Sequence, residues 1–324
     1  MRAIQIQKTG GPDALELRDV PEPQPGPGQA LVRLEAIGVN FIDIYLREGR
    51  YPAPLPFIPG QEGAGVVEAV APDVSAFKPG DRVAWMSMHT QGAYAEYALV
   101  SVSELIAVPE KVTPRQAAAV MLQGMTAHYL SRASYVIQPG ETVLIHAGAG
   151  GVGLLLIQMA KRLGARVLTT VSTEEKAALA YQAGADETIL YTREDFVERT
   201  RALTNDEGVP VVYDSVGKTT FDGSLKCLRP RGMLVLYGGS SGPVPPFDPI
   251  QLSALGSLYI TRPTLKHYTL TRAELETRAG DVLRSIADGN LNLRMDHDYP
   301  LTEAAQAHRD LEGRRTTGKV LLIP

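Results

Sequence analysis

Apolar positions recur with two different periods along this 324-residue chain, and the clearest change of period lies near residue 145. Val143 to Ile145 form a short apolar run typical of a buried strand, and residues 154–163 carry a helical apolar pattern. Beyond them the pattern predicts strands at 165–172, 187–190, 209–216 and 232–238, separated by helices at 174–183, 194–203 and 220–228. Strands that alternate with helices at this spacing predict an α/β domain with a doubly wound parallel sheet, which binds ligands outside the carboxyl ends of its strands.

The first 140 residues follow a different pattern, in which short strands are separated by turns rich in glycine and proline. Strands are predicted at 2–8, 14–19, 29–37, 63–70, 82–85 and 94–100. Such a series is typical of a partly open β-barrel. Helices are expected at 114–121, 124–134, 272–287 and 302–311, and a last strand at 319–323 is expected to return to this first domain.

A glycine-rich segment, Gly148-x-Gly150-x-x-Gly153, joins the strand at 143–145 to the helix that follows it. This order of strand, loop and helix is the context that a dinucleotide-binding fingerprint requires. Gly148 is expected to allow the tight turn, Gly150 to let the backbone approach a pyrophosphate, and Gly153 to let the helix pack closely. Because unpaired N–H groups and the helix dipole favour phosphate at such a helix start, we predict that the loop binds the cofactor through Gly148, Gly150, Gly151, Val152 and Gly153.

The end of the second strand of this domain indicates which dinucleotide binds. An acidic residue about 20 positions after the loop would bind the ribose 2′-hydroxyl of NAD. The strand ends instead at Ser172 and Thr173, and Lys176 follows in the first turn of the next helix. A hydroxyl and a cation suit a 2′-phosphate, whereas Glu174 is an ordinary first-turn acid that the helix dipole favours. The sequence therefore predicts NADP.

The composition and charge of the chain bear on whether it binds nucleic acid, crosses a membrane or is secreted. Hydrophobic residues make up 44% and charged residues 21%, which is ordinary for a globular protein, and 32 basic against 36 acidic residues leave a net charge of −4. Without a basic tract, a dedicated nucleic-acid surface is not expected. No signal-peptide pattern or membrane-spanning run is recognised. Cys227 is the only cysteine, so no internal disulfide can form, which favours the reducing cytoplasm.

Motifs along the whole chain resemble those of the zinc-independent, zeta-crystallin-like quinone oxidoreductases of the medium-chain dehydrogenase/reductase superfamily. Besides the glycine loop, the landmarks are Ala36-Ile-Gly-Val-Asn-Phe-Ile-Asp43, Pro59-Gly-Gln-Glu-Gly-Ala-Gly65, Pro79-Gly-Asp-Arg-Val83, Gly92-Ala-Tyr-Ala-Glu96, Val212-Tyr-Asp-Ser-Val-Gly217 and Gly256-Ser-Leu-Tyr-Ile-Thr-Arg-Pro263. The resemblance implies a GroES-like catalytic domain at 1–123 and 265–324, and a Rossmann NADP-binding domain at 124–264. It also implies a homodimer or homotetramer joined through the Rossmann domains.

The same resemblance indicates that the catalytic zinc of the alcohol dehydrogenases is absent. Where those relatives carry a cysteine and a histidine ligand, this chain has Asn40 and Gln61. Glu62 is then the only possible zinc ligand that remains at this site. A catalytic zinc site needs three protein ligands of the cysteine, histidine or carboxylate type. The six histidines, at 89, 128, 146, 267, 297 and 308, show no ligand spacing and are interpreted as surface or satisfied core residues.

By resemblance, the loop from Asn40 to Tyr51 forms the substrate pocket. Asn40 and Tyr51 are expected to donate hydrogen bonds to the cofactor amide or to the acceptor oxygen, and Tyr45 and Thr126 to line the site. Asp43 either orients a neighbour or caps a short helix. Further cofactor contacts are implied for Tyr191 at the 2′-phosphate, for Tyr237, Gly238, Ser240 and Ser241 along the nicotinamide ribose, and for Arg262 near the domain interface.

These features favour an NADPH:quinone oxidoreductase, because a quinone accepts hydride readily without a metal and the protein mainly has to orient cofactor and acceptor. An NADPH-dependent reductase of α,β-unsaturated carbonyls is the enzymatic alternative, since a tyrosine could supply the proton that its enolate requires. A nucleotide-binding structural or RNA-binding protein of the crystallin type is the non-enzymatic alternative.

Overall fold

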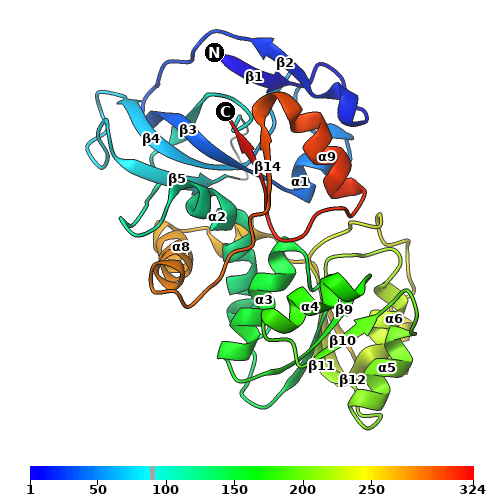
Figure 1. Cartoon of the computed structure of the whole chain (residues 1–324). Coiled ribbons are helices and arrows are strands. Elements are labelled where there is room, and N and C mark those ends of the chain that lie inside the picture. The colour runs from blue at the N-terminus through cyan, green and yellow to red at the C-terminus, as the bar shows by residue number, and fades with distance from the viewer. Residues whose placement is uncertain (88–91) are drawn as a thin grey trace. The chain divides into compact units, whose positions relative to one another are not determined.

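The computed structural model describes residues 1–87 and 92–324, and the chain divides into two compact units (Figure 1). One unit comprises Met1–Met125 together with Thr269–Pro324, and the other comprises Thr126–Tyr268. His89, one of the histidines considered above, lies outside the described residues.

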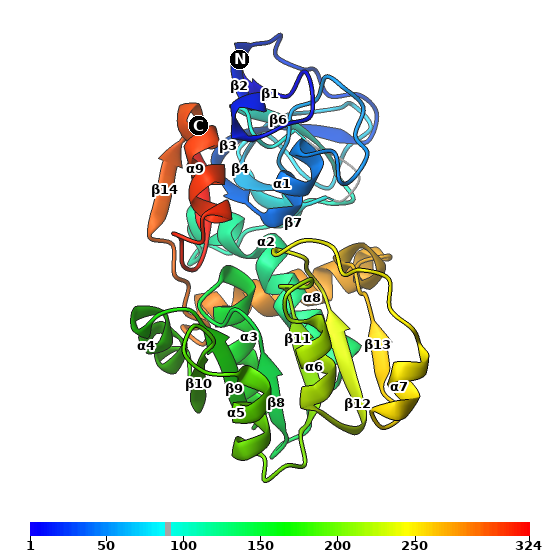
Figure 2. The same ribbon diagram turned by 90° about the vertical axis from the view of Figure 1, so that its right-hand side faces the viewer.

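The unit Thr126–Tyr268 is built on a six-stranded sheet whose paired strands are all parallel. In spatial order its strands are β10 (Glu187–Leu190), β9 (Arg166–Val171), β8 (Thr142–Ile145), β11 (Val209–Asp214), β12 (Leu228–Leu236) and β13 (Tyr259–Thr261) (Figure 2). Counted along the domain this is the order 3-2-1-4-5-6, which reverses between β8 and β11 and so creates the switch point at which doubly wound folds bind ligands. The predicted doubly wound parallel sheet is confirmed.

The connections of this unit are mostly helical. The helices are α3 (Gly151–Arg162), α4 (Glu174–Gln182), α5 (Phe196–Leu203), α6 (Phe221–Cys227) and α7 (Ile250–Ala254), followed by a 3₁₀ turn at Leu265–Tyr268. The helix predicted from residue 194 begins two residues later, because the Asp195 carboxylate accepts hydrogen bonds from the N–H groups of Val197 (2.7 Å) and Glu198 (3.1 Å) and so caps it. Neither α7 nor β13 was predicted from the sequence.

The other unit contains a seven-stranded sheet and a separate hairpin of β1 (Arg2–Gln5) and β2 (Glu16–Asp19). The seven-stranded sheet runs β14 (His297–Pro300), β15 (Val320–Ile323), β3 (Gln29–Val39), β4 (Glu62–Val70), β5 (Arg82–Met86) and β7 (Ile106–Ala107), with β6 (Tyr97–Ser101) also paired to β3. The last strand returns to this unit as predicted, since β15 pairs antiparallel with β3 and places Val320 opposite Val39.

The helices α1 (Phe41–Arg47), α8 (Arg272–Ala287) and α9 (Ala304–Glu312) belong to this unit, as does the greater part of α2 (Pro114–Tyr129). The predicted pair of helices at 114–121 and 124–134 is wrong, because residues 114–129 form the single helix α2 (Pro114–Tyr129) and a π turn continues it over Leu130–Ser134. Gly124 lies within this continuous helix. A side chain is excluded there by packing, because a Cβ would lie 2.7 Å from Val282 Cγ1 of α8.

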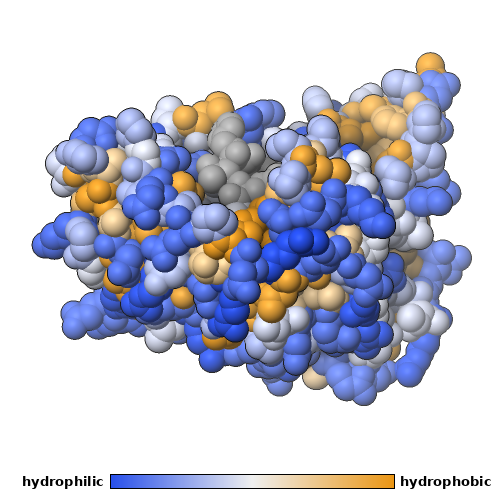
Figure 3. Space-filling model, turned by 90° about the horizontal axis from the view of Figure 1, so that it is seen from above, coloured by the Kyte–Doolittle hydropathy of each residue, from blue (hydrophilic) through white to orange (hydrophobic). Residues whose placement is uncertain are grey.

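Hydrophilic residues cover most of the face drawn in Figure 3, and apolar residues appear there in small patches. Among the described residues, no helix combines the length and apolar character needed to cross a bilayer.

Candidate functional site

The glycine loop leads from β8 into α3 and leaves the start of that helix open. Gly150 is the N-cap of α3, and no side chain caps the helix there. A Cβ added at Gly150 would meet only the Ala147 carbonyl oxygen, at 3.2 Å. At Gly153 a Cβ would lie 2.3 Å from the same oxygen, which agrees with the close packing predicted for this glycine. The loop therefore presents uncovered backbone N–H groups in the way that phosphate binding requires.

Gly148 has a different role from the one predicted. The residue of the turn with a left-handed backbone is Ala147, with φ of 55°. Gly148 is required instead by packing against the neighbouring strand, because a Cβ there would lie 2.1 Å from Thr169 Oγ1. Its N–H also donates to the Thr170 carbonyl at 3.1 Å. The first glycine thus seats the loop on β9 and does not itself supply the turn conformation.

A buried polar network supports this loop from inside the sheet. The Thr170 hydroxyl lies 2.9 Å from His146 Nδ1, and His146 Nε2 lies 3.0 Å from the Ser224 hydroxyl, which donates to Asp214 at 2.8 Å. Since Ser224 donates to the carboxylate, it accepts from His146 Nε2–H, so Nδ1 accepts from Thr170. Burial lowers the pKa of His146, in agreement with a neutral ring. His146 is therefore a satisfied core residue, as predicted.

The ends of β9 and β10 bring together the residues predicted to bind a 2′-phosphate. The two strands pair in parallel with Leu190 opposite Val171, so Ser172 and Tyr191 follow them at the same edge of the sheet. The Thr192 hydroxyl donates to the Ser172 carbonyl at 3.1 Å, which ties the two loops together. Lys176 lies in the first turn of α4, where its backbone N–H reaches the Thr173 hydroxyl at 3.3 Å.

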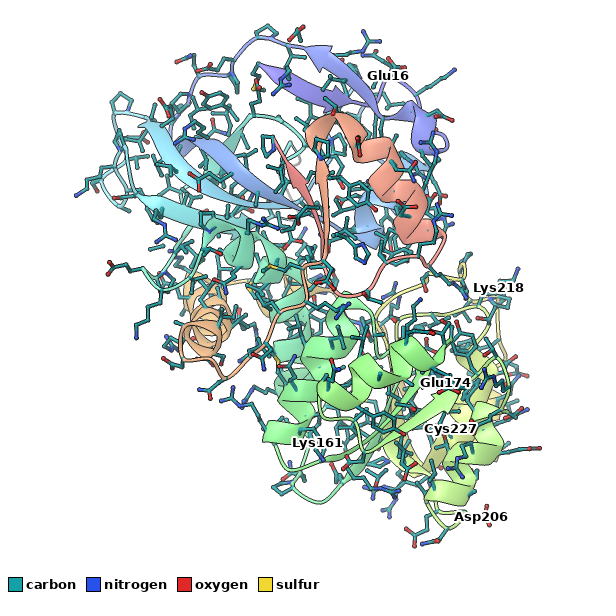
Figure 4. All side chains as sticks on the ribbon, viewed as in Figure 1. Glu16, Lys161, Glu174, Asp206, Lys218 and Cys227 are labelled. Atoms are coloured by element: carbon teal, nitrogen blue, oxygen red, sulfur yellow. The ribbon has the colours of Figure 1, made fainter. Side chains whose placement is uncertain are left out.

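Sequence reasoning missed a second cation at this edge. Arg193 forms an ion pair with Glu174 at 2.7 Å, and both side chains are more than 60% exposed (Glu174 is labelled in Figure 4). Its position two residues after Tyr191, past a predicted strand end, was the signal that could have identified it. Because the ion pair is exposed, its own contribution to stability is small and the guanidinium can exchange partners readily.

The loop after β12 packs tightly against the loop after β11. A Cβ at Gly238 would lie 2.4 Å from the Ser215 carbonyl oxygen, and the Ser240 N–H donates to the same oxygen at 3.1 Å. The Ser241 hydroxyl donates to the Val216 carbonyl at 2.7 Å. These contacts hold the segment that contains Tyr237, whose pKa is raised above its ordinary value by burial.

Arg262 is exposed at the end of β13, and its guanidinium donates to the Leu236 carbonyl at 3.1 Å, which fixes it at the end of the sheet.

Tyr129 and Tyr268 stack 4.2 Å apart with nearly parallel rings. Thr126, at 7% exposure, lies within α2.

In the unit Met1–Met125 with Thr269–Pro324, Asn40 lies at the centre of a buried polar cluster. It directly follows β3, is the N-cap of α1 and is only 4% exposed. Its Nδ2 donates to Glu62 Oε1 at 2.6 Å and makes a longer contact of 3.4 Å with the Gly38 carbonyl. Its Oδ1 accepts from Lys319 Nζ at 2.9 Å and from Gln123 Nε2 at 3.3 Å. Lys319 and Glu62 also form a direct ion pair.

Asp43 links the start of α1 to a second buried group. Its Oδ2 accepts from the Asn40 backbone N–H at 2.9 Å and from the Tyr94 hydroxyl at 3.2 Å, whereas Oδ1 is buried without a partner. Burial, only partly offset by these contacts, raises the pKa of Asp43 to about 7. Of the two roles considered for Asp43, the structure shows the helix cap and adds a contact with Tyr94.

The network continues from Tyr94 to His308 of α9 and then to Arg47 of α1. Figure 1 shows these two helices near each other. Arg47 Nη1 can only donate, so His308 Nδ1 accepts at 3.0 Å and His308 Nε2–H donates to the Tyr94 hydroxyl at 3.0 Å. Burial, followed by the charge of Arg47, lowers the pKa of His308 to about 3. The Arg47 guanidinium is itself paired with Glu312.

The two tyrosines predicted for the pocket lie together on α1 and the turn after it. Their rings meet edge to face at 5.8 Å, and the Arg50 guanidinium lies 5.2 Å from the centre of the Tyr45 ring. The Tyr51 N–H reaches the Tyr45 carbonyl at 3.4 Å. Tyr51 follows the C-terminal end of α1 and is 42% exposed, whereas Asn40, the N-cap of that helix, is buried.

Comparison with known proteins agrees with this architecture. Residues 26–110 match the model of the alcohol dehydrogenase GroES-like domain, and residues 151–281 match that of the zinc-binding dehydrogenases. A quinone oxidoreductase of Pseudomonas aeruginosa is 48% identical over 100% of this chain and 99% of its own length. The chain belongs to the quinone oxidoreductase family of the medium-chain dehydrogenases/reductases.

Two further relatives of this family bear on its chemistry. The structure of Escherichia coli quinone oxidoreductase complexed with NADPH matches with a TM-score of 0.98 and 42% identity, covering 100% of both chains. A 2-haloacrylate reductase of a Burkholderia species is 44% identical over 99% of this chain and 98% of its own length.

The zinc named by the matched family model does not fit the residues present in this chain. Within residues 1–87 and 92–324, no group of three or more His, Cys, Asp or Glu side chains is placed to hold a metal ion. Glu62, the one candidate ligand left at the expected position, is already paired with the Lys319 ammonium, a cation in direct contact with the carboxylate. The only cysteine, Cys227, is buried at the end of α6 (Figure 4).

Proposed function

We propose that this protein is an NADPH:quinone oxidoreductase that works without a metal. The observation that carries this proposal is the likeness over the whole chain to enzymes named quinone oxidoreductases, one of them solved with NADPH. We assign the NADP-binding role to the unit Thr126–Tyr268 and the acceptor-binding role to the unit that contains Asn40 and Tyr51.

The residues of the nucleotide unit suit NADPH. The open backbone at Gly150 and the uncapped start of α3 suit the pyrophosphate, which Gly151, Val152 and Gly153 would contact through their N–H groups. Ser172, Lys176 and Tyr191 would bind the 2′-phosphate, and Arg193, whose ion pair with Glu174 is exposed, would exchange that partner for the phosphate. Along the nicotinamide ribose we propose Tyr237, Gly238, Ser240, Ser241 and Arg262.

When bound, NADPH supplies a hydride. Two-electron reduction of a quinone takes up this hydride and one proton from solvent, and gives a hydroquinone and NADP⁺. What the protein must contribute is orientation, together with hydrogen-bond donors aimed at the acceptor oxygen, on which negative charge develops. We propose Asn40 and Tyr51 as these donors, with Tyr45 and Thr126 lining the site. The 42% exposure of Tyr51 supports this role.

A second candidate function is the reduction of α,β-unsaturated carbonyl compounds. The relative named 2-haloacrylate reductase favours it, since at 44% identity it is as similar to this chain as several of the quinone oxidoreductases are. Hydride addition to the β-carbon leaves an enolate that needs a proton donor. The Tyr51 hydroxyl could provide that proton, so the same residues suit either reaction.

The experiment that separates these functions is anaerobic NADPH oxidation across benzoquinones, ortho-naphthoquinones, enones, enoyl thioesters and 2-haloacrylates. We expect the highest kcat/KM with a quinone. A clear preference for enones or haloacrylates would replace the first proposal with the second. If no acceptor is turned over although NADPH binds, a non-enzymatic role of the crystallin type would be favoured.

We further propose a cytoplasmic homodimer or homotetramer joined through the nucleotide units. β13 is the edge strand of the parallel sheet and carries Tyr259, which is 58% exposed, and nearby Ile250 is 69% exposed. An unpaired edge with exposed apolar side chains is suited to pairing with a second copy. Light scattering during size-exclusion chromatography tests this, and Tyr259→Lys should shift the protein towards the monomer.

A further inference from the structure

Lys319 is a buried cation, only 3% exposed, and the strand pairing places it beside Asn40. β15 and β3 pair antiparallel with Val320 opposite Val39, so the residue before Val320 lies next to the residue after Val39. The Lys319 ammonium reaches Asn40 Oδ1 at 2.9 Å and is paired with Glu62. A buried lysine is expensive unless it is paired and hydrogen-bonded, and here both partners are supplied.

Glu62 is held equally firmly on the other side of Asn40. Its Oε2 accepts from the Leu122 backbone N–H of α2 at 2.6 Å, which leaves Oε1 for Asn40 and Lys319. Gly38 makes room for this carboxylate, because a Cβ there would lie 2.2 Å from Glu62 Oε1. The carboxylate therefore has one fixed position between β3, β4 and α2.

Together the two charges fix which way the Asn40 amide faces. The carboxylate requires an N–H group and the ammonium requires an oxygen, so rotating the amide by 180° would place N–H against ammonium and oxygen against carboxylate. Asn40 Oδ1 already accepts two hydrogen bonds, from Lys319 and Gln123. One Nδ2 hydrogen is used by Glu62, and the other has only the 3.4 Å contact with Gly38.

We infer that Lys319 and Glu62 are positioning residues that lock the Asn40 amide so that it presents a single N–H donor, and no acceptor, to a bound ligand. The inference rests on the proposed function for its catalytic consequence. A donor of fixed direction suits an acceptor oxygen that gains negative charge, because no reorientation is needed as the charge develops. A freely rotating amide would present its own oxygen to that charge part of the time.

Whether the amide is held in place can be tested without enzyme activity. The chain has only four asparagines, at 40, 205, 290 and 292, so selective ¹⁵N-asparagine labelling gives four side-chain amide pairs, and Asn40→Ala identifies the pair from Asn40. In the parent protein we expect the Asn40 side-chain protons to exchange with solvent at least tenfold more slowly than those of exposed Asn205. We expect this protection to fall several-fold in Lys319→Met/Glu62→Gln, where the glutamine amide can meet either side of Asn40.

The double variant is preferred because Lys319→Met alone would leave the Glu62 carboxylate buried and unpaired, and could fail to fold. Lys111→Met, at an exposed position of the same unit, controls for the loss of a lysine. Unchanged protection of the Asn40 protons in the folded double variant would show that the charges do not lock the amide, and would overturn the inference.

Kinetics then test whether the lock acts through Asn40. We expect the double variant to lower kcat/KM for quinone about tenfold, and to lower it less than twofold further when Asn40 is already alanine. If the double variant instead lowers kcat/KM by the same factor whether residue 40 is asparagine or alanine, Lys319 and Glu62 act independently of Asn40. That result would overturn the positioning role. If the parent protein reduces no quinone, the proposed function fails, while the labelling measurement still decides whether the amide is locked.

Discussion

Asp43 and His308 are joined by a single hydroxyl: Tyr94 Oη lies 3.2 Å from Asp43 Oδ2 and 3.0 Å from His308 Nε2. Burial shifts the pKa values of the two groups in opposite directions, to about 7 for Asp43 and to about 3 for His308. Between about pH 4 and pH 6.5 the folded protein therefore keeps a proton on the carboxyl and none on the imidazole, whereas the unfolded chain does the reverse.

This relationship predicts opposite pH dependences of stability for two variants. For Asp43 the folded state binds more protons than the unfolded state between pH 3.8 and about 7, so its contribution to stability falls as the pH rises through this window. For His308 the folded state binds fewer protons between about pH 3 and 6.5, so its contribution rises with pH. Each slope is about 1.4 kcal/mol per pH unit, and in the parent protein the two nearly cancel.

Urea unfolding at pH 5 and at pH 6.5 tests this cancellation. Relative to the parent protein, Asp43→Asn should gain about 2 kcal/mol of stability over that interval, because the His308 slope is no longer opposed. His308→Gln, which can still accept from Arg47 and donate to Tyr94, should lose about 2 kcal/mol over the same interval. Parallel curves for all three proteins would mean that neither group has a shifted pKa.

A second prediction concerns the choice of cofactor. NADPH should bind at least tenfold more tightly than NADH, a difference of roughly 1.4 kcal/mol, because Ser172 and Lys176 lie where the additional phosphate is expected. Lys176→Ala should reduce that preference and leave NADH affinity unchanged. Fluorescence titration with both nucleotides measures it.

Lys226→Ala is the matched control for this measurement, since Lys226 is an exposed lysine on α6 of the same unit. It should leave both affinities unchanged. Equal affinity of the parent protein for NADPH and NADH would contradict the interpretation of the Ser172 and Lys176 positions.

The absence of a metal requirement is a third prediction. Elemental analysis should find no stoichiometric zinc, and incubation with a chelator should leave NADPH:quinone activity unchanged. The reason is that the Glu62 carboxylate is already paired with the Lys319 ammonium. One tightly held zinc per chain, removed together with activity, would require a ligand set different from the one described above.

The sequence predicted the nucleotide unit more completely than the other unit, for a physical reason. Buried parallel strands such as β8 and β11 are short apolar runs, and the helices between them repeat with a helical period. The strand β13, by contrast, has just three residues and an exposed Tyr259, so its apolar signal is weak. The break predicted between residues 121 and 124 does not exist, because residues 114–129 form one continuous helix in which Gly124 packs closely against Val282 of α8.

The polar cluster shows the same limit for the candidate site. Asn40 and Glu62 were recognised because each stands within a motif of the family, but Lys319 is 257 residues from Glu62 and resembles any other lysine at the start of a strand. Only the pairing of β15 with β3 brings it to Asn40. Long-range contacts of this kind depend on the sheet topology, which local patterns do not encode.

The last prediction concerns the hydroxyl of Tyr51. Tyr51→Phe keeps the ring and its edge-to-face contact with Tyr45, so it separates the loss of a hydrogen bond from the loss of packing. If the hydroxyl donates to the acceptor oxygen as charge develops there, kcat/KM for quinone should fall. The corresponding loss of transition-state stabilisation should be about 1–2 kcal/mol, the net contribution of one such bond. A larger loss is not expected, because quinones are intrinsically reactive towards hydride.

NADPH affinity and thermal stability should change much less in this variant, because the Tyr51 side chain is 42% exposed and contributes little to the core. Tyr45→Phe, at the partner ring on α1, provides the matched comparison, since Tyr45 is expected to line the site and not to donate to the acceptor. A decrease confined to Tyr51→Phe would identify its hydroxyl as the donor. If both variants retain the kinetics of the parent protein, the tyrosine pair serves packing alone and the donor has to be sought at Asn40.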